Sequence, residues 1–253
     1  MEPTATEPKG RSGSLKNPEV VDVPGHVIPT IEKEFDDFDT EAARFMRGEV
    51  DEEQFIGFRL KQGVYGQRQA NVQMIRVKLP FGGVSPEQME AFAEVAERYT
   101  PLVKGHITTR QNIQYHHVPL PDAAKAIRLL SEAGLSSREA CGNTVRNVTG
   151  DPWAGVTDEL YDITPYAGAF VRYFVRNEIC QLLPRKFKVA FTANDDDRAI
   201  TKIHDLGFIP RVREVDGREV KGVEIRTGGG TSIMARVGST LYDFVEVENG
   251  DYL

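Results

Sequence analysis

Four short segments place cationic side chains beside turn residues or along a predicted strand. They are residues 75–83, 108–117, 141–152 and 183–188. Arg76 and Lys78 lie two residues apart, as do Lys186 and Lys188, so on a strand each pair would share one face. Cations on one strand face are costly unless they face water or bind an anion. Two interpretations follow: solvated surface residues, or parts of an anion-binding site.

Three histidines form a second group that could do chemistry, namely His106, His116 and His117. Adjacent residues on a strand point to opposite faces, so His116 and His117 cannot both easily bind one metal ion. The only cysteines, Cys141 and Cys180, form no CxxC pair, so no zinc-site spacing is present. Core packing or simple hydrogen bonding is the commoner role for such histidines, and both thiols are expected to be buried.

The glycine run at residues 228–230 does not indicate a nucleotide site. No Gly-Lys-Ser/Thr follows it, and no GxGxxG follows a predicted strand, which excludes a P-loop and leaves a Rossmann site without support. A tight turn or a close approach of the backbone to a cofactor explains the run instead. No Ser-His-Asp or Cys-His arrangement has a recognisable context.

The overall composition limits the classes of function. The chain has 253 residues, 40% of them hydrophobic, and a formal net charge of −7. A general nucleic-acid binder would carry a basic excess, so no nucleic-acid partner is expected. No apolar run is long enough to cross a bilayer, and the N-terminus lacks the apolar stretch of a signal peptide. We therefore expect a cytoplasmic protein with no membrane partner.

Hydrophobic spacing and turn residues predict the first elements. Residues 1–30 are rich in Pro, Gly, Glu, Lys and Ser, which predicts a disordered leader. Over 31–70 the pattern predicts a helix ending near Gly48 and then an extended arm. A strand over 72–79 precedes a helix of about 85–99, whose Ser85 and Gln88 form a capping box.

The remaining pattern predicts two α+β units. Strands near 105–109 and 112–118 and a helix over 122–133 complete a β-α-β-β-α order, which is typical of a ferredoxin-like half-domain over 71–134. A second α+β unit over 135–253 is predicted to contain a loop at 141–153, a helix over 164–183 and a strand over 186–192. It also contains a hairpin that turns at Asp216-Gly217. The predicted fold class is α+β.

Five pieces of the sequence carry a resemblance to a known family. They are MIRVKLPFGG, TTRQNIQYHH, ACGNTVRNVTGDP, LPRKFK and GGGTS, in this order. In content and order they resemble the sirohaem and iron–sulfur family of assimilatory sulfite and nitrite reductases, over about residues 58–232. The resemblance implies a ferredoxin-like half-domain followed by part of a larger α+β sirohaem-binding domain. It also implies the six-electron reduction of sulfite to sulfide, or of nitrite to ammonia.

The resemblance assigns residues to the site individually. The substrate oxyanion would be held by Arg76, Arg146, Lys186 and Lys188. Sirohaem would be contacted by His106, Thr108, Arg110, Gln114, His116 and Arg185; His106 stands where some relatives have arginine. Guanidinium and ammonium groups can bind an oxyanion, polarise its bonds and help to deliver protons.

One position bears on the choice of substrate. Lys186-Phe187-Lys188 resembles the Lys-x-Lys of sulfite reductases, whereas plant-type nitrite reductases tend to carry Lys-x-Asn. A fourth cation suits the dianionic form of sulfite better than singly charged nitrite. We therefore expect sulfite, with nitrite as the alternative substrate.

The cysteine count departs from the family pattern. Family members bind a [4Fe–4S] cluster through four cysteines of their C-terminal half, and electrons from ferredoxin or a flavoprotein reach sirohaem through it. This chain has two cysteines, in other places. We expect it to be the N-terminal half of such an enzyme, inactive without the C-terminal half. A non-catalytic sirohaem-binding module is the alternative.

Overall fold

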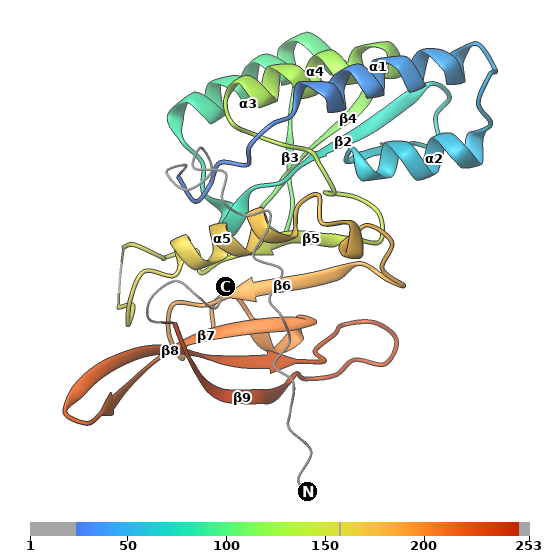
Figure 1. The fold of residues 1–253 in the computed structure, drawn as a ribbon. Helices are drawn as coiled ribbons and strands as arrows, with labels where there is room; N and C mark the ends of the chain where they lie inside the picture. Colours follow the sequence, from blue (N-terminus) through green and yellow to red (C-terminus); the bar gives the residue numbers. More distant parts are fainter. Residues whose placement is uncertain (1–23, 157, 248–253) are drawn as a thin grey trace, which may run out of the picture.

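The protein consists of two β-sheets with helices packed on them (Figure 1). The computed structural model describes residues 24–156 and 158–247. The strand orders are β1-β2-β4-β3 in the first sheet and β5-β6-β7-β8-β9 in the second. None of the helices within the described ranges has the length and apolar character needed to cross a membrane.

The first sheet is antiparallel and carries helices on it (Figure 1). Its strands are β1 (Val64–Gly66), β2 (Val72–Val77), β3 (His106–Ile107) and β4 (Ile113–Pro119). The helices are α1 (Glu32–Met46), α2 (Glu52–Lys61), α3 (Pro86–Tyr99) and α4 (Leu120–Glu132). Phe38, Ile75 and Tyr115 lie fully buried in the core between them. The predicted β-α-β-β-α order and the capping box of Ser85 with Gln88 are confirmed.

The second sheet is mixed and packs against α5 (Thr164–Phe174). Its parallel strands are β5 (Val145–Thr149), β6 (Phe187–Phe191) and β7 (Leu206–Val215), and its antiparallel ones are β8 (Arg218–Thr227) and β9 (Ser239–Glu246). The rings of Phe191 and Phe208 stack with centroids 4.3 Å apart, and Phe170 of α5 packs on both. The predicted hairpin with its turn at Asp216-Gly217 is confirmed.

The prediction of an extended arm between Phe55 and Ala70 is wrong, because α2 runs to Lys61 and β1 then pairs with β2 in the first sheet. The Asp51 side chain caps this helix by accepting a hydrogen bond from the Gln54 backbone N–H at 2.8 Å. Most of the predicted leader lies outside the described residues. Its last part, residues 24–30, is packed, since Ile28 is 1% exposed in the core of the second sheet.

Two predictions in the second unit are also corrected. The predicted loop over 141–153 contains strand β5. The predicted helix over 164–183 ends at Phe174, because Val175 is extended with ψ 131° and the next residue, Arg176, is left-handed with φ +65°. A short 3₁₀ helix, η3 (Glu178–Cys180), follows. Strand β9 was not predicted, and the unit boundary at residue 135 stays a prediction.

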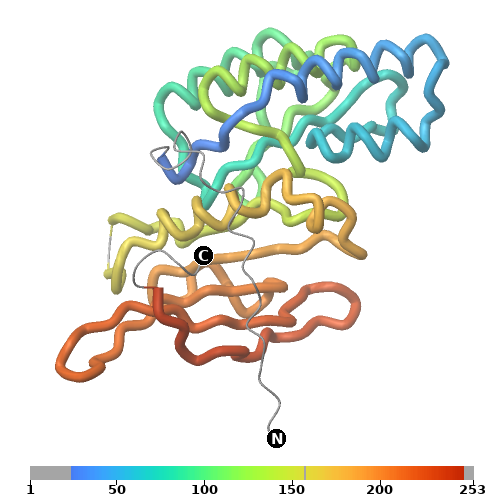
Figure 2. Tube along the Cα trace, viewed as in Figure 1, coloured from blue at the N-terminus to red at the C-terminus, as the bar shows by residue number. Residues whose placement is uncertain are grey.

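The chain joins the two sheets more than once (Figure 2). Residues 24–30 lie beside α5, so a Cβ on Gly168 would come within 2.6 Å of the Gly25 carbonyl oxygen. A second junction forms where the 3₁₀ helix η2 (Pro80–Gly82) contacts the end of β5. There the Gln111 amide donates to the Gly150 carbonyl and accepts from the Gly150 N–H, both at 2.8 Å.

Gly150 is the position where this junction tolerates no side chain. A Cβ at Gly150 would lie 2.5 Å from the Cβ of Phe81, which is too close to be relieved by side-chain rotation. We expect Gly150→Ala to lower the free energy of unfolding by about 1–3 kcal/mol, as overpacking does in well-packed cores. Urea unfolding followed by circular dichroism measures this difference in unfolding free energy.

The control is Gly57→Ala on the exposed side of α2, where nothing lies within 4 Å of the added Cβ. It should stabilise the protein by up to about 1 kcal/mol, because alanine restricts the unfolded chain. Equal unfolding free energies for the two variants would contradict the tight junction at Gly150.

Candidate anion and cofactor site

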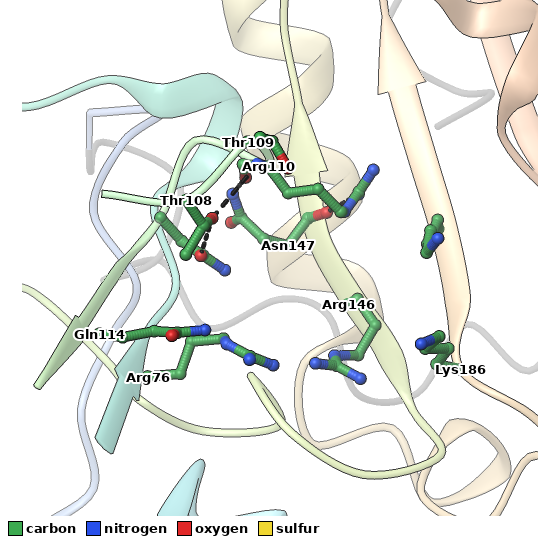
Figure 3. Close-up of a pocket in the computed structure, with 10 residues that line it drawn as sticks. Arg76, Thr108, Thr109, Arg110, Gln114, Arg146, Asn147 and Lys186 are labelled. Atoms are coloured by element: carbon green, nitrogen blue, oxygen red, sulfur yellow. Dashed lines mark hydrogen bonds between the residues drawn. The ribbon is translucent and has the colours of Figure 1, made fainter. Parts of the chain in front are cut away.

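A cavity of about 240 Å³ lies between the two sheets, and among the described residues five cations and no carboxylate line it (Figure 3). The lining residues are Arg76, Thr108, Thr109, Arg110, Asn112, Gln114, Arg146, Asn147, Lys186 and Lys188. Seven of the ten residues that the sequence assigns to substrate or cofactor belong to this set. Unpaired cations around one hollow make it a candidate site for an anion.

The other three predicted residues lie next to the cavity. Arg185 lines an adjoining hollow of about 350 Å³ together with Lys186 and Lys188. His106 and His116 face each other across β3 and β4 with ring centroids 5.7 Å apart. The Gln114 amide connects His116 to the cavity. In the orientation that satisfies both neighbours, its nitrogen donates to His116 Nε2 at 3.2 Å and its oxygen accepts from Arg76 Nε at 2.8 Å.

Lys188 lines three hollows: the cavity, the hollow that Arg185 also lines, and a third one of about 340 Å³. Arg110, Arg198 and His204 also line the third hollow. The cationic surface thus extends well beyond the space that a small oxyanion would fill.

Backbone carbonyls hold two of the cations in place. Arg146 donates from Nε to the Ala140 carbonyl at 3.0 Å and from a terminal nitrogen to the Gly142 carbonyl at 3.2 Å. Arg76 donates to the same Ala140 carbonyl at 3.2 Å. Burial lowers the pKa of Arg146, and the charge of Arg76 acts in the same direction. These neutral acceptors fix the guanidinium groups while leaving their charge uncompensated.

Burial and neighbouring cations disfavour the charged forms of Arg110 and Lys188, although Asp205 acts in the opposite direction on both. Burial lowers the pKa of Arg110 to about 10, with a further contribution from Arg146. Burial likewise lowers the pKa of Lys188, and Arg110 and Lys186 add to that effect. A bound anion would relieve this repulsion.

Lys78 does not share the cavity with Arg76, contrary to the expectation from their spacing. Strand β2 ends at Val77, and Lys78 instead pairs with Ser136 through its backbone. Its side chain is 2% exposed, and burial lowers its pKa to about 8 despite the opposing effect of Glu139.

Two residues that the sequence analysis did not single out hold the site together. Asn147 is 1% exposed; its oxygen accepts from the Leu79 N–H at 2.9 Å, and its nitrogen donates to the carbonyls of Arg110 and Gln111. Nε2 of His204 lies 2.5 Å from a terminal guanidinium nitrogen of Arg110. Asn147 stands inside one of the five quoted pieces, whereas no local pattern marks His204.

The two cysteines do not fit an iron–sulfur cluster. Cys141 and Cys180 are both buried and unpaired, and a [4Fe–4S] cluster of this kind needs four thiolates. Within residues 24–156 and 158–247, no group of three or more His, Cys, Asp or Glu side chains could hold a metal ion. The described part of the chain therefore offers a cationic site and no cluster site.

Replacing Asn147 should destabilise the protein. Asn147→Ala would leave the buried Leu79 N–H and two carbonyls without their partner, so the free energy of unfolding should fall by about 2–4 kcal/mol. The matched control is Asn143→Ala, an exposed asparagine of the same segment, which should stay within about 0.5 kcal/mol. Urea unfolding distinguishes the two, and equal losses would contradict the bridging role of Asn147.

Stability should fall in mild acid because two histidines are held neutral. Burial lowers the pKa of both His116 and His204. As the pH falls below the ordinary histidine pKa of about 6.5, the unfolded chain takes up protons that the folded chain excludes, so the free energy of unfolding decreases. Above that pH this contribution is fully present.

Urea unfolding at about pH 7.5 and about pH 5.5 measures the decline. His204→Gln removes one of the two groups, so its decline should be smaller than that of the wild type. Carboxylates contribute equally to both proteins and cancel in the comparison. Equal declines would show that His204 is not held neutral.

Two family models match most of the described chain. The ferredoxin-like half-domain of nitrite and sulfite reductases matches residues 65–133, and the nitrite and sulphite reductase 4Fe-4S domain matches residues 141–252. The assimilatory ferredoxin-dependent nitrite reductase of Haloferax mediterranei is 35% identical over 203 residues, which are 75% of this chain and 35% of that protein. The ferredoxin–nitrite reductase of Leptolyngbya laminosa is 33% identical over 161 residues, 62% of this chain and 31% of that protein.

A solved structure agrees with these matches. The Mycobacterium tuberculosis NirA protein superposes with a TM-score of 0.69 at 26% identity, over 78% of this chain and 38% of that one. The chain spans about a third of the length of the curated relatives it matches. The two domain matches together cover most of the described residues, in the order that the two sheets follow. The chain therefore belongs to the nitrite and sulfite reductase family.

Proposed function

We propose that this chain supplies the substrate pocket and part of the sirohaem cradle of a sulfite reductase. One observation carries the proposal: Arg76, Arg146, Lys186 and Lys188 converge on one cavity, to whose lining the described part of the chain contributes no carboxylate. Arg76 comes from β2 of the first sheet and Arg146 from β5, whereas Lys186 directly precedes β6 and Lys188 lies within it. Figure 3 shows Arg76, Arg146 and Lys186 around the cavity. Such a set binds an oxyanion through charge-assisted hydrogen bonds.

The donor chemistry around the cavity fits sirohaem. A tetrapyrrole with many carboxylates needs many hydrogen-bond donors and cations, and the three hollows that meet at Lys188 provide them. We assign sirohaem contacts to His106, Thr108, Arg110, Gln114, His116 and Arg185. When bound, sirohaem would supply the electrons that reduce the oxyanion.

The cations would act on the substrate in two ways. The N–H groups of Arg76 and Arg146 would hold its oxygens, and the charges would polarise the bonds to be broken. Lys188 is half-buried, and its lowered pKa makes its ammonium group a better proton donor to an oxygen that leaves as water.

Nitrite is the second candidate substrate, because the two relatives described above are named nitrite reductases. Their names also support ferredoxin as the electron donor, with a flavoprotein as the alternative. Lys188 favours sulfite, since a further cation stabilises a dianion more than a monoanion. The [4Fe–4S] cluster ligands would come from a C-terminal half that carries four cysteines, and we expect no turnover without it.

The proposal is tested by producing the chain together with such a cluster-binding half. The complex should show a sirohaem absorption spectrum and reduce sulfite with methyl viologen as the electron donor. A complex without sirohaem would contradict the proposal. Sirohaem without reduction of either anion would favour a non-catalytic binding module.

The substrate preference is tested by Lys188→Asn. The variant should lose about tenfold or more in kcat/KM for sulfite, because it removes one charge beside the dianion, and should lose less for nitrite. Lys104→Asn, which removes an exposed lysine outside the cavity lining, should leave both values unchanged. A larger loss for nitrite than for sulfite would make nitrite the preferred substrate.

A further inference from the structure

Arg110 is held in an unusual way for a buried cation. Its guanidinium lies between two hollows and lines both of them. One terminal nitrogen contacts His204 Nε2 at 2.5 Å, and the other donates to the carbonyls of Asn147 at 2.5 Å and Val189 at 3.4 Å. All three partners are neutral acceptors. Among the described residues, no carboxylate forms an ion pair with Arg110.

The contacts of His204 fix its tautomer. A guanidinium can only donate, so Nε2 of His204 must carry a lone pair and no proton. Nδ1 then carries the proton and donates to the Ile200 carbonyl at 2.8 Å. His204 directly follows η4 (Thr201–Ile203) and is 7% exposed, so its ring cannot easily turn away from Arg110.

The surroundings favour the neutral ring. Burial lowers the pKa of His204, and the charges of Arg110 and Lys188 add to this. Asp205 and the hydrogen bond to Ile200 act in the opposite direction and are outweighed.

We propose that His204 is a positioning residue that orients Arg110 without neutralising it, so that the guanidinium charge remains available to an anion in the cavity. The inference rests on the anion site proposed above and adds a residue that the family resemblance does not assign. A carboxylate at the same place would orient Arg110 equally well. It would also cancel the charge that the anion needs.

Two variants of equal length separate orientation from charge. In His204→Gln the amide oxygen can accept from Arg110, and in His204→Glu a carboxylate does so. His204→Phe keeps a ring of similar size but offers no acceptor. Inorganic sulfate is the probe, because it stays a dianion over the working pH range. Its affinity for the 253-residue chain is measured by calorimetry.

His204→Gln should bind sulfate within about threefold of the wild type, since the hydrogen bond is kept. His204→Phe should bind sulfate about tenfold more weakly than the wild type. His204→Glu should bind it at least about tenfold more weakly. A purely structural role predicts the same affinity for the Gln and Glu variants. That result, or wild-type affinity in the Phe and Glu variants, would overturn the proposal.

Nitrogen chemical shifts of the imidazole give a second readout that needs no ligand. At about pH 7 the His204 ring should show a protonated Nδ1 and a bare Nε2. A proton on Nε2 would overturn the proposal. If the wild type binds sulfate and sirohaem but the variants do not differ, only the role of His204 fails. If the wild type binds neither, the anion site itself fails.

Discussion

The burial of like charges beside one another is the constraint on which the rest of the site depends. Within residues 24–156 and 158–247, five cationic side chains and no carboxylate line one cavity. Each charge costs free energy when it is buried near the others, as the lowered pKa values of Arg110, Arg146 and Lys188 indicate. An anion that enters removes this cost, so binding and folding stability are coupled. Without a bound anion, the fold must supply the free energy that holds the cations together.

That free energy comes from the contacts between the two sheets. Arg76 belongs to the first sheet, and Arg146 and Lys188 to the second, so their separation is set by how the sheets meet. The junction combines the buried hydrogen bonds of Asn147 with the close contact between Gly150 and Phe81. A polar network that is fully satisfied is rigid, which keeps the cations at fixed distances. Stability and anion binding thus depend on the same few contacts.

Much of the fold could be predicted because its signals are local. The capping box of Ser85 and the turn at Asp216-Gly217 each need only a few adjacent residues. Strand β5 was missed because Arg146 and Asn147 interrupt its apolar pattern, and both side chains serve the cavity or the junction. Helix α2 was missed because Gly57 and several polar residues mask its periodicity.

The candidate site could be predicted only through the family resemblance. Seven of the ten residues that the resemblance assigns line one cavity. His204 could not be found in this way, because its role depends on contacts with Arg110 and Ile200 that chain folding creates. Lys78 was placed beside Arg76 by strand alternation, but the strand ends one residue too early.

The position of Ile28 has a consequence for the order in which the protein is made. This residue leaves the ribosome before the whole first sheet, yet its apolar neighbours lie in the core of the second sheet, whose strands follow those of the first sheet in the chain. In a nascent chain, the segment around Ile28 therefore cannot reach its native packing until α5 and β6 have left the ribosome. The first sheet can form early. The packing of Ile28 into the second core, however, requires almost the entire described chain.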